Sequence, residues 1–187
     1  MVVPPIELDP LPNVLVDIAA WFVIHASTAY AAHRLPLDRL QHDNWLLRPR
    51  RIEAGGRLYE RIGIKRWKDA LPEAGALFAG GLTKRSLPSV ADGGLERFAA
   101  ETRRGELCHW LAMAGGPLFV LWNPPLVAAM MIAYGVLVNA PFIAIQRYNR
   151  ARVSRCRARR RRSASTAGSS ETPTRRRSRD ITGSNIP

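Results

Sequence analysis

Cysteine is scarce in this sequence. Cys108 lies in an apolar run and Cys156 lies among arginines, so we do not expect the two to form a disulfide bond. No CxxC pair and no Cys/His ligand spacing occurs, which leaves no indication of a structural zinc site. We therefore expect neither a metal nor a cofactor.

Lysine and arginine are absent from long stretches of the chain. The 28 basic residues lie in two blocks, Arg34–Arg104 and Arg147–Arg179. An N-terminus without basic residues argues against a cleaved signal peptide, and so against a secreted protein. The net charge of +13 is thus segregated from the apolar stretches, although the mean hydropathy of −0.13 is ordinary for a soluble protein. This segregation is typical of a membrane protein.

Three apolar stretches are candidate transmembrane helices, at about residues 14–33, 105–122 and 126–146. About twenty residues in a helix, at ~1.5 Å each, match the ~30 Å hydrocarbon core of a bilayer. The middle stretch is the shortest, and Pro117 predicts a kink in it. Asn139 and Pro141 are expected to break the last turns of the third. We expect an all-α integral membrane protein with about three spans.

The basic blocks predict the orientation of these spans. The loop of residues 34–106 and the C-terminal tail are both basic, so both are expected in the cytoplasm. The N-terminus and the turn at residues 123–125 carry no Lys or Arg and are expected outside. We expect a multi-pass cell-membrane protein with a membrane domain at residues 1–152. Residues 153–187 form an Arg-rich tail that is expected to be disordered.

The loop between the first two spans mixes cations with aromatic residues. Its segment Leu58–Phe78 is predicted either to lie on the membrane surface or to be a solvated loop with a few packing anchors. Lys65, Arg66 and Trp67 suit an anionic lipid head group or a phosphorylated donor, although such runs are weakly specific.

The densest chemistry lies at residues 101–110, where the second helix enters the membrane. Glu106 and His109 are three residues apart and share a helix face. A carboxylate beside a histidine can orient the ring and raise its basicity, which is what deprotonating a hydroxyl nucleophile requires. Plain salt bridges beside an interfacial histidine would give the same pattern. The candidate residues here are Glu101, Glu106 and His109 for catalysis, and Arg103 and Arg104 for substrate binding.

A second polar cluster follows the third span directly. Arg147 and Arg150 could hold a phosphate or a carboxylate, or they could be ordinary cytoplasmic anchors of the span. Asn139 and Asn149 complete the candidate substrate-binding residues.

Two sequence blocks resemble a known family. Residues 101–110 (ETRRGELCHW) and 139–150 (NAPFIAIQRYNR) resemble the signatures of the glycosyl-4,4'-diaponeurosporenoate acyltransferase family, and residues 66–72 (RWKDALP) match its central motif more loosely. Order and spacing agree over about Trp21–Arg152. Gly105 stands where the family pattern has Ala, and the Arg-rich tail lies outside the shared core.

The resemblance implies a membrane acyltransferase. Members esterify a sugar hydroxyl of a glycosylated C30 carotenoid with a fatty acyl chain, the last step towards staphyloxanthin-like pigments. The implied partners are a fatty acyl donor such as acyl-CoA, a glycosylated carotenoid or related glycolipid acceptor, and membrane lipids, with no specific nucleic acid. We expect His109 to be the general base and Glu106 to orient it. Arg103, Arg104 and Arg147 would hold donor phosphates or the developing oxyanion.

Two rival hypotheses stay open. The chain could be a non-catalytic assembly or scaffold protein whose tail binds anionic lipid or nucleic acid. It could also be another membrane transferase, acting on a different prenyl or lipid substrate. Deleting Ser154–Pro187 should spare an enzyme and disable a tail-driven binder.

Overall fold

The computed structural model describes residues 4–71 and 93–170, which contain helices and no strand. The expected all-α fold class is confirmed. The chain divides into two compact units, Met1–Arg155 and Cys156–Pro187. Among the described residues the elements are α1 (Pro10–Arg34), η1 (Leu37–Leu40), η2 (Arg51–Gly56), α2 (Arg57–Arg61), α3 (Ile64–Trp67), α4 (Gly94–Ala114), η5 (Gly116–Leu121) and α5 (Pro125–Ser170), the η elements being 3₁₀ helices.

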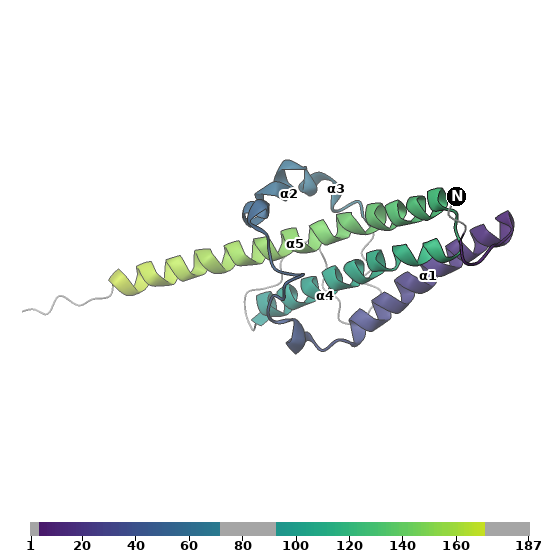
Figure 1. Cartoon of the computed structure of the whole chain (residues 1–187). Coiled ribbons are helices and arrows are strands. Elements are labelled where there is room, and N and C mark those ends of the chain that lie inside the picture. The colour runs from purple at the N-terminus through teal and green to yellow at the C-terminus, as the bar shows by residue number, and fades with distance from the viewer. Residues whose placement is uncertain (1–3, 72–92, 171–187) are drawn as a thin grey trace, which may run out of the picture. The chain divides into compact units, whose positions relative to one another are not determined.

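Two of the described helices, α1 and α5, are long and apolar enough to cross a membrane. Their apolar side chains are largely exposed: Phe22 is 74%, Leu126 75% and Leu137 73% accessible. Apolar exposure on this scale is expected of helices that face lipid. Helix α4 lies between α1 and α5 (Figure 1).

The expected middle span at residues 105–122 is divided in the structure. Helix α4 ends at Ala114, and η5 continues from Gly116 with Pro117 in its first turn. Proline suits the first turn of a helix because that N–H has no intrahelical acceptor. The stretch is therefore not one continuous apolar helix, and it is not among the two helices that satisfy the length and hydropathy of a span.

Two expectations for α5 are wrong. Its last membrane turns are not broken, because the helix runs unbroken through Pro141 and the Asn139 amide bonds the Gly135 carbonyl within it. Residues 153–170 are helical instead of disordered, and their many Arg and Ala residues are good helix formers. The remainder of the expected tail, residues 171–187, lies outside the described residues.

Three side-chain hydrogen bonds connect the turn before α5 to the first half of α1. Asp17, 6% exposed, accepts hydrogen bonds from Trp122 Nε1 at 2.7 Å and Asn123 Nδ2 at 2.8 Å. Asn13 Nδ2 donates to Asn123 Oδ1 at 2.7 Å. These bonds offset the cost of placing a carboxylate in an apolar helix.

Trp21 packs α1 against η5 and α5. Its ring is buried and stacks on Phe119 with centroids 4.9 Å apart, and it meets Tyr134 edge-on at 5.3 Å. A Cβ atom at Gly135 would lie only 2.6 Å from Trp21 Cη2. Glycine at this position is thus what allows the indole to reach α5.

We expect Gly135→Ala to destabilise the protein by about 1–3 kcal/mol, the usual cost of overpacking a core. Thermal unfolding in detergent micelles measures it. Gly105→Ala is the matched control, because its new methyl would meet only the movable end of the Gln146 side chain. Equal melting temperatures for the two variants would contradict the packing described here.

The described part of the segment after α1, residues 35–71, packs against α4 and α5. Tyr59 and Ile64 form a buried cluster with Ile145 and Tyr148 of α5, and Trp67 packs against its edge. For residues 58–78 the sequence allowed two interpretations, a segment on the membrane surface or a solvated loop. The described part, up to Leu71, packs against α5, so it is not a fully solvated loop. The rest of that segment lies outside the described residues.

Candidate active site

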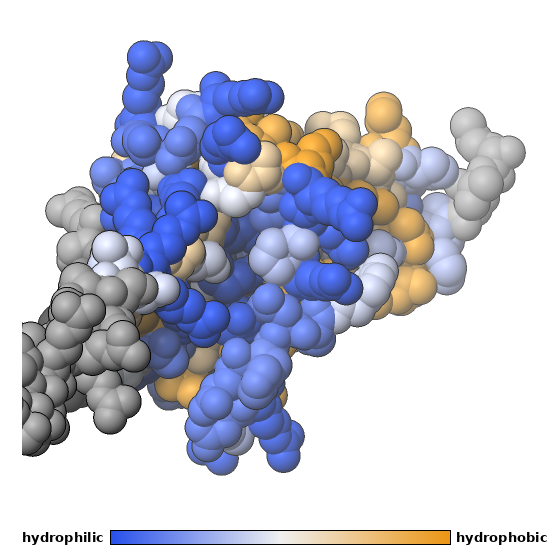
Figure 2. All heavy atoms as spheres, turned by 90° about the vertical axis from the view of Figure 1, so that its left-hand side faces the viewer, coloured by the Kyte–Doolittle hydropathy of each residue, from blue (hydrophilic) through white to orange (hydrophobic). Residues whose placement is uncertain are grey.

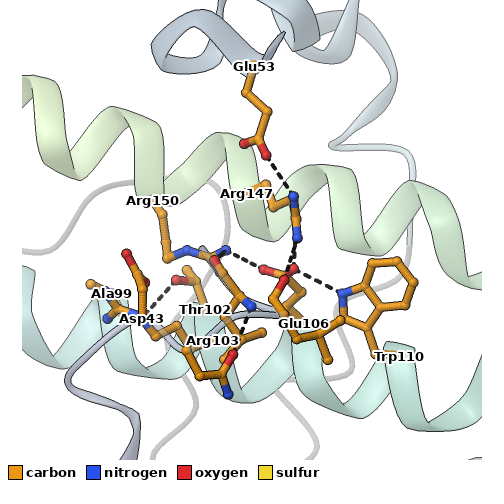
Figure 3. A network of polar contacts seen from close by, with 12 residues as sticks. Asp43, Glu53, Ala99, Thr102, Arg103, Glu106, Trp110, Arg147 and Arg150 are labelled. Carbon is orange, nitrogen blue, oxygen red and sulfur yellow. Dashed lines mark hydrogen bonds and ion pairs between the residues drawn. The ribbon is translucent and has the colours of Figure 1, made fainter. Parts of the chain in front are cut away.

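Glu106 lies at the centre of a buried polar network between α4 and α5 (Figure 3). Its Oε1 accepts hydrogen bonds from Trp110 Nε1 at 3.0 Å and Arg147 Nε at 2.7 Å. Its Oε2 is paired with Arg150 Nη2. The carboxylate has 0% exposure, so these partners supply the stabilisation that water would otherwise give.

Arg147 extends the network to the segment before α2. Its Nη1 is 2.6 Å from Glu53 Oε1, and its Nη2 donates to the Leu46 carbonyl at 2.8 Å. Arg150 Nη2 also donates to the Leu47 carbonyl. Glu53, Glu106, Arg147 and Arg150 together carry no net charge, and they fix residues 46–53 against α5.

Tyr59 adds to the Glu53 end of this network. Burial raises the pKa of its phenol above the usual range, and the nearby Glu53 carboxylate raises it further. The phenol therefore stays protonated at physiological pH.

These contacts correct several expected roles. Glu106 does not orient His109, because its oxygens are held by Trp110, Arg147 and Arg150. Arg147 and Arg150, which were expected to bind the phosphate of the donor, form ion pairs with carboxylates of the protein itself. The cluster at residues 101–110 of α4 is in this respect a salt-bridge network.

Arg103 and Arg104 have comparable protein partners. Arg103 Nε donates to Asp43 Oδ1 at 2.6 Å, and its Nη1 donates to the Leu40 carbonyl. Arg104 pairs with Glu101 one turn earlier and donates from Nη2 to the Leu35 carbonyl at 2.7 Å. The two arginines thus anchor the segment after α1 onto α4.

His109 is held by Asn139 and Phe142. His109 Nδ1 is 2.9 Å from Asn139 Oδ1, and its ring stacks on Phe142 with centroids 4.7 Å apart. Asn139 Nδ2 donates to the Gly135 carbonyl at 2.8 Å, which fixes the amide orientation. Because Oδ1 can only accept, Nδ1 is the donor in this contact, and the neutral ring then has its lone pair on Nε2. That tautomer is the one a general base needs.

The pairing of His109 with Asn139 was missed, although both were candidates. Asn139 was expected only among the substrate-binding residues. The two residues lie at nearly equal chain distances from the turn at Asn123, so an antiparallel hairpin places them at the same level. That symmetry was the available signal.

Four expected substrate-binding residues lie elsewhere. Lys65 pairs with Glu60 in the α2–α3 segment, Arg66 is exposed, and Trp67 donates from Nε1 to the Ile62 carbonyl. Asn149 is buried, 1% exposed, on α5. None of these contacts joins them to His109.

Taken together, fold and site define a helical membrane protein with a tautomer-fixed histidine beside a neutral buried ion network. A family model described as glycosyl-4,4'-diaponeurosporenoate acyltransferase matches residues 43–159, which include that histidine and its asparagine. The chain belongs to this family, as its motifs indicated, and it is an acyltransferase.

Similar proteins carry the same name. Two from Staphylococcus aureus, strains bovine RF122 / ET3-1 and USA300, are each 26% identical over 135 residues, which covers 72% of this chain and 81% of the relative. No solved structure matches the chain.

Proposed function

We propose that this acyltransferase esterifies a sugar hydroxyl of a glycosylated carotenoid, or of a related glycolipid, with a fatty acyl chain delivered as acyl-CoA. The observation that carries the proposal is the His109–Asn139 pair, whose amide is fixed by the Gly135 carbonyl. In this pair, His109 has an orientation in which it could act as the base for the hydroxyl group of the acyl acceptor.

In the proposed reaction, His109 Nε2 accepts the hydroxyl proton as the sugar oxygen attacks the thioester carbonyl. The tetrahedral intermediate then expels the thiolate of CoA, and the imidazolium returns the proton to that sulfur. Asn139 acts as a positioning residue that holds the ring by accepting from Nδ1–H. Phe142 covers one ring face, which helps to exclude the water that would hydrolyse the donor.

We also propose the membrane arrangement. The second half of α4 with η5 would form a third pass, with the N-terminus and the turn at residues 123–125 outside. Figure 2 looks onto the end of the molecule where α4 begins, and hydrophilic side chains gather there. Exposed cations such as Arg57, Arg61 and Arg66 lie in the segment before α4, where they would meet anionic lipid or the phosphates of the donor on the cytoplasmic side.

The test is ester formation by the intact protein in lipid nanodiscs. Palmitoyl-CoA is supplied with glycosyl-4,4'-diaponeurosporenoate or with an alkyl glucoside, and products are identified by mass spectrometry. We expect an acylated sugar and released CoA. Two results together would favour the non-catalytic alternative. The folded protein would form no ester in nanodiscs, and deleting its gene from the host strain would leave the lipids of that strain unchanged.

A further inference from the structure

A cavity of about 1040 Å³ lies between the first half of α1 and the start of α5. Asn13, Asp17, Trp21 and His25, spaced four residues apart, form its α1 wall. Val127, Met131 and Tyr134, spaced three and four apart, form its α5 wall, and residues 4–8 lie at its other end. Two helix faces thus line an elongated, partly open space about ten residues, or ~15 Å, long.

The chemistry of this lining selects against charged head groups. Most of its residues are apolar or aromatic, its acidic residues are Glu7 and Asp17, and it contains no Lys or Arg. A phosphate or carboxylate here would find no Lys or Arg to pair with in a medium of low dielectric constant. Asp17 is in addition already bonded to Trp122 and Asn123. An uncharged hydrocarbon chain fits both facts.

One end of the cavity approaches the His109 site. Tyr134 lines the cavity, and the next residue, Gly135, supplies the carbonyl that fixes Asn139. Asn139 is five residues after Tyr134, a rise of about 7 Å along the helix axis. Measured along the helix axis, a chain in the cavity would therefore end within about two turns of the level of Asn139.

We infer that this cavity binds the single hydrocarbon chain of a lipid substrate, with the reacting polar end of the lipid directed towards His109. The inference rests on the proposed function for the identity of that substrate. The volume matches that of pockets which enclose small ligands. The chain could belong to the glycolipid acceptor or to the acyl donor, which share this chemistry.

Two neighbouring methionines provide a matched test. Met131 lines the cavity, whereas Met130 is 58% exposed on α5 and does not line it. Met131→Trp should fill the space, and Met130→Trp adds the same side chain outside it. Each full-length variant is placed in nanodiscs with one of two photoprobes carrying a diazirine at the chain end: an alkyl glucoside, or an acyl-CoA.

We expect a probe to label cavity-lining residues of α1 or α5 in the unmodified protein. Met131→Trp should reduce that labelling about tenfold, the effect of excluding roughly two methylene groups from an apolar pocket. Met130→Trp should leave it unchanged. Labelling by the glucoside alone assigns the chain to the acceptor, and labelling by the acyl-CoA alone assigns it to the donor.

Labelling that is equal in both variants, or spread evenly over lipid-facing residues, would overturn the inference. A second measurement does not depend on protein yield: Met131→Trp should shift the ester products towards shorter chains relative to Met130→Trp. If the unmodified protein is labelled in the cavity but forms no ester, the proposed function fails and the binding site stands. If it forms ester with neither labelling nor chain-length shift, the binding site fails alone.

Discussion

Glu106→Gln is expected to cost about 3–5 kcal/mol of folding stability, the loss seen when one partner of a buried ion pair is removed. The amide keeps the shape of the side chain but removes the negative charge that Arg147 and Arg150 share. The side chains of Arg147 and Arg150 are only 10% and 4% exposed, so the remaining positive charge is poorly solvated unless the contact between α4 and α5 opens.

Thermal unfolding in detergent micelles measures this effect, and Glu60→Gln is the control. Glu60 also pairs with an arginine, Arg155, but their side chains are 33% and 40% exposed, so its loss should cost at most about 1 kcal/mol. The double variant Glu106→Gln/Arg150→Met removes one charge of each sign, and it should recover part of the stability.

The same variant separates structure from chemistry at Glu106. If Glu106→Gln has the melting temperature of the unmodified protein but forms no ester, Glu106 takes part directly in catalysis. A protein that unfolds early, with stability partly restored by Arg150→Met, would show that Glu106 acts by fixing α5 against α4.

The sequence predicted which segments are long apolar helices, but it did not predict how those helices pack against one another. Apolar runs in α1 and α5 are long, and hydropathy detects them because each lipid-facing turn must be apolar. Pro117 indicated an interruption of the middle stretch, and the structure has one after Ala114. The continuity of α5 through Pro141 depends on packing against other helices, which one segment does not reveal.

The candidate residues were found for reasons that were only partly right. Spacing of three residues placed Glu106 and His109 on one face, which suggested that they pair. In the structure Glu106 turns to Arg147 and Arg150, and His109 turns to Asn139, all of them on α5. Such partners are distant in sequence, and local spacing cannot rank them against a neighbour on the same helix.

We expect His109→Gly to reduce the rate of ester formation by about 10²–10⁴-fold, the contribution of a positioned general base. The protein should remain folded, because the buried ion network does not include His109. The rate is measured at saturating acyl-CoA and glycolipid, with the melting temperature recorded beside it. His42→Gly is the control: this exposed histidine in the segment after α1 lies outside the site, and its loss should leave the rate unchanged.

Added imidazole distinguishes a base from a packing residue. The space left by the deleted side chain, between Phe142 and Asn139, can admit free imidazole, whose N–H can bond Asn139 Oδ1 as the ring of His109 does. Imidazole should therefore restore part of the rate to His109→Gly and none to His109→Gly/Asn139→Leu, in which the acceptor that orients the ring is missing. Rescue that is equal in both variants would mean that Asn139 does not position the base. Full activity of His109→Gly without imidazole would remove His109 from the reaction, and the hydroxyl proton would then have to pass to another group.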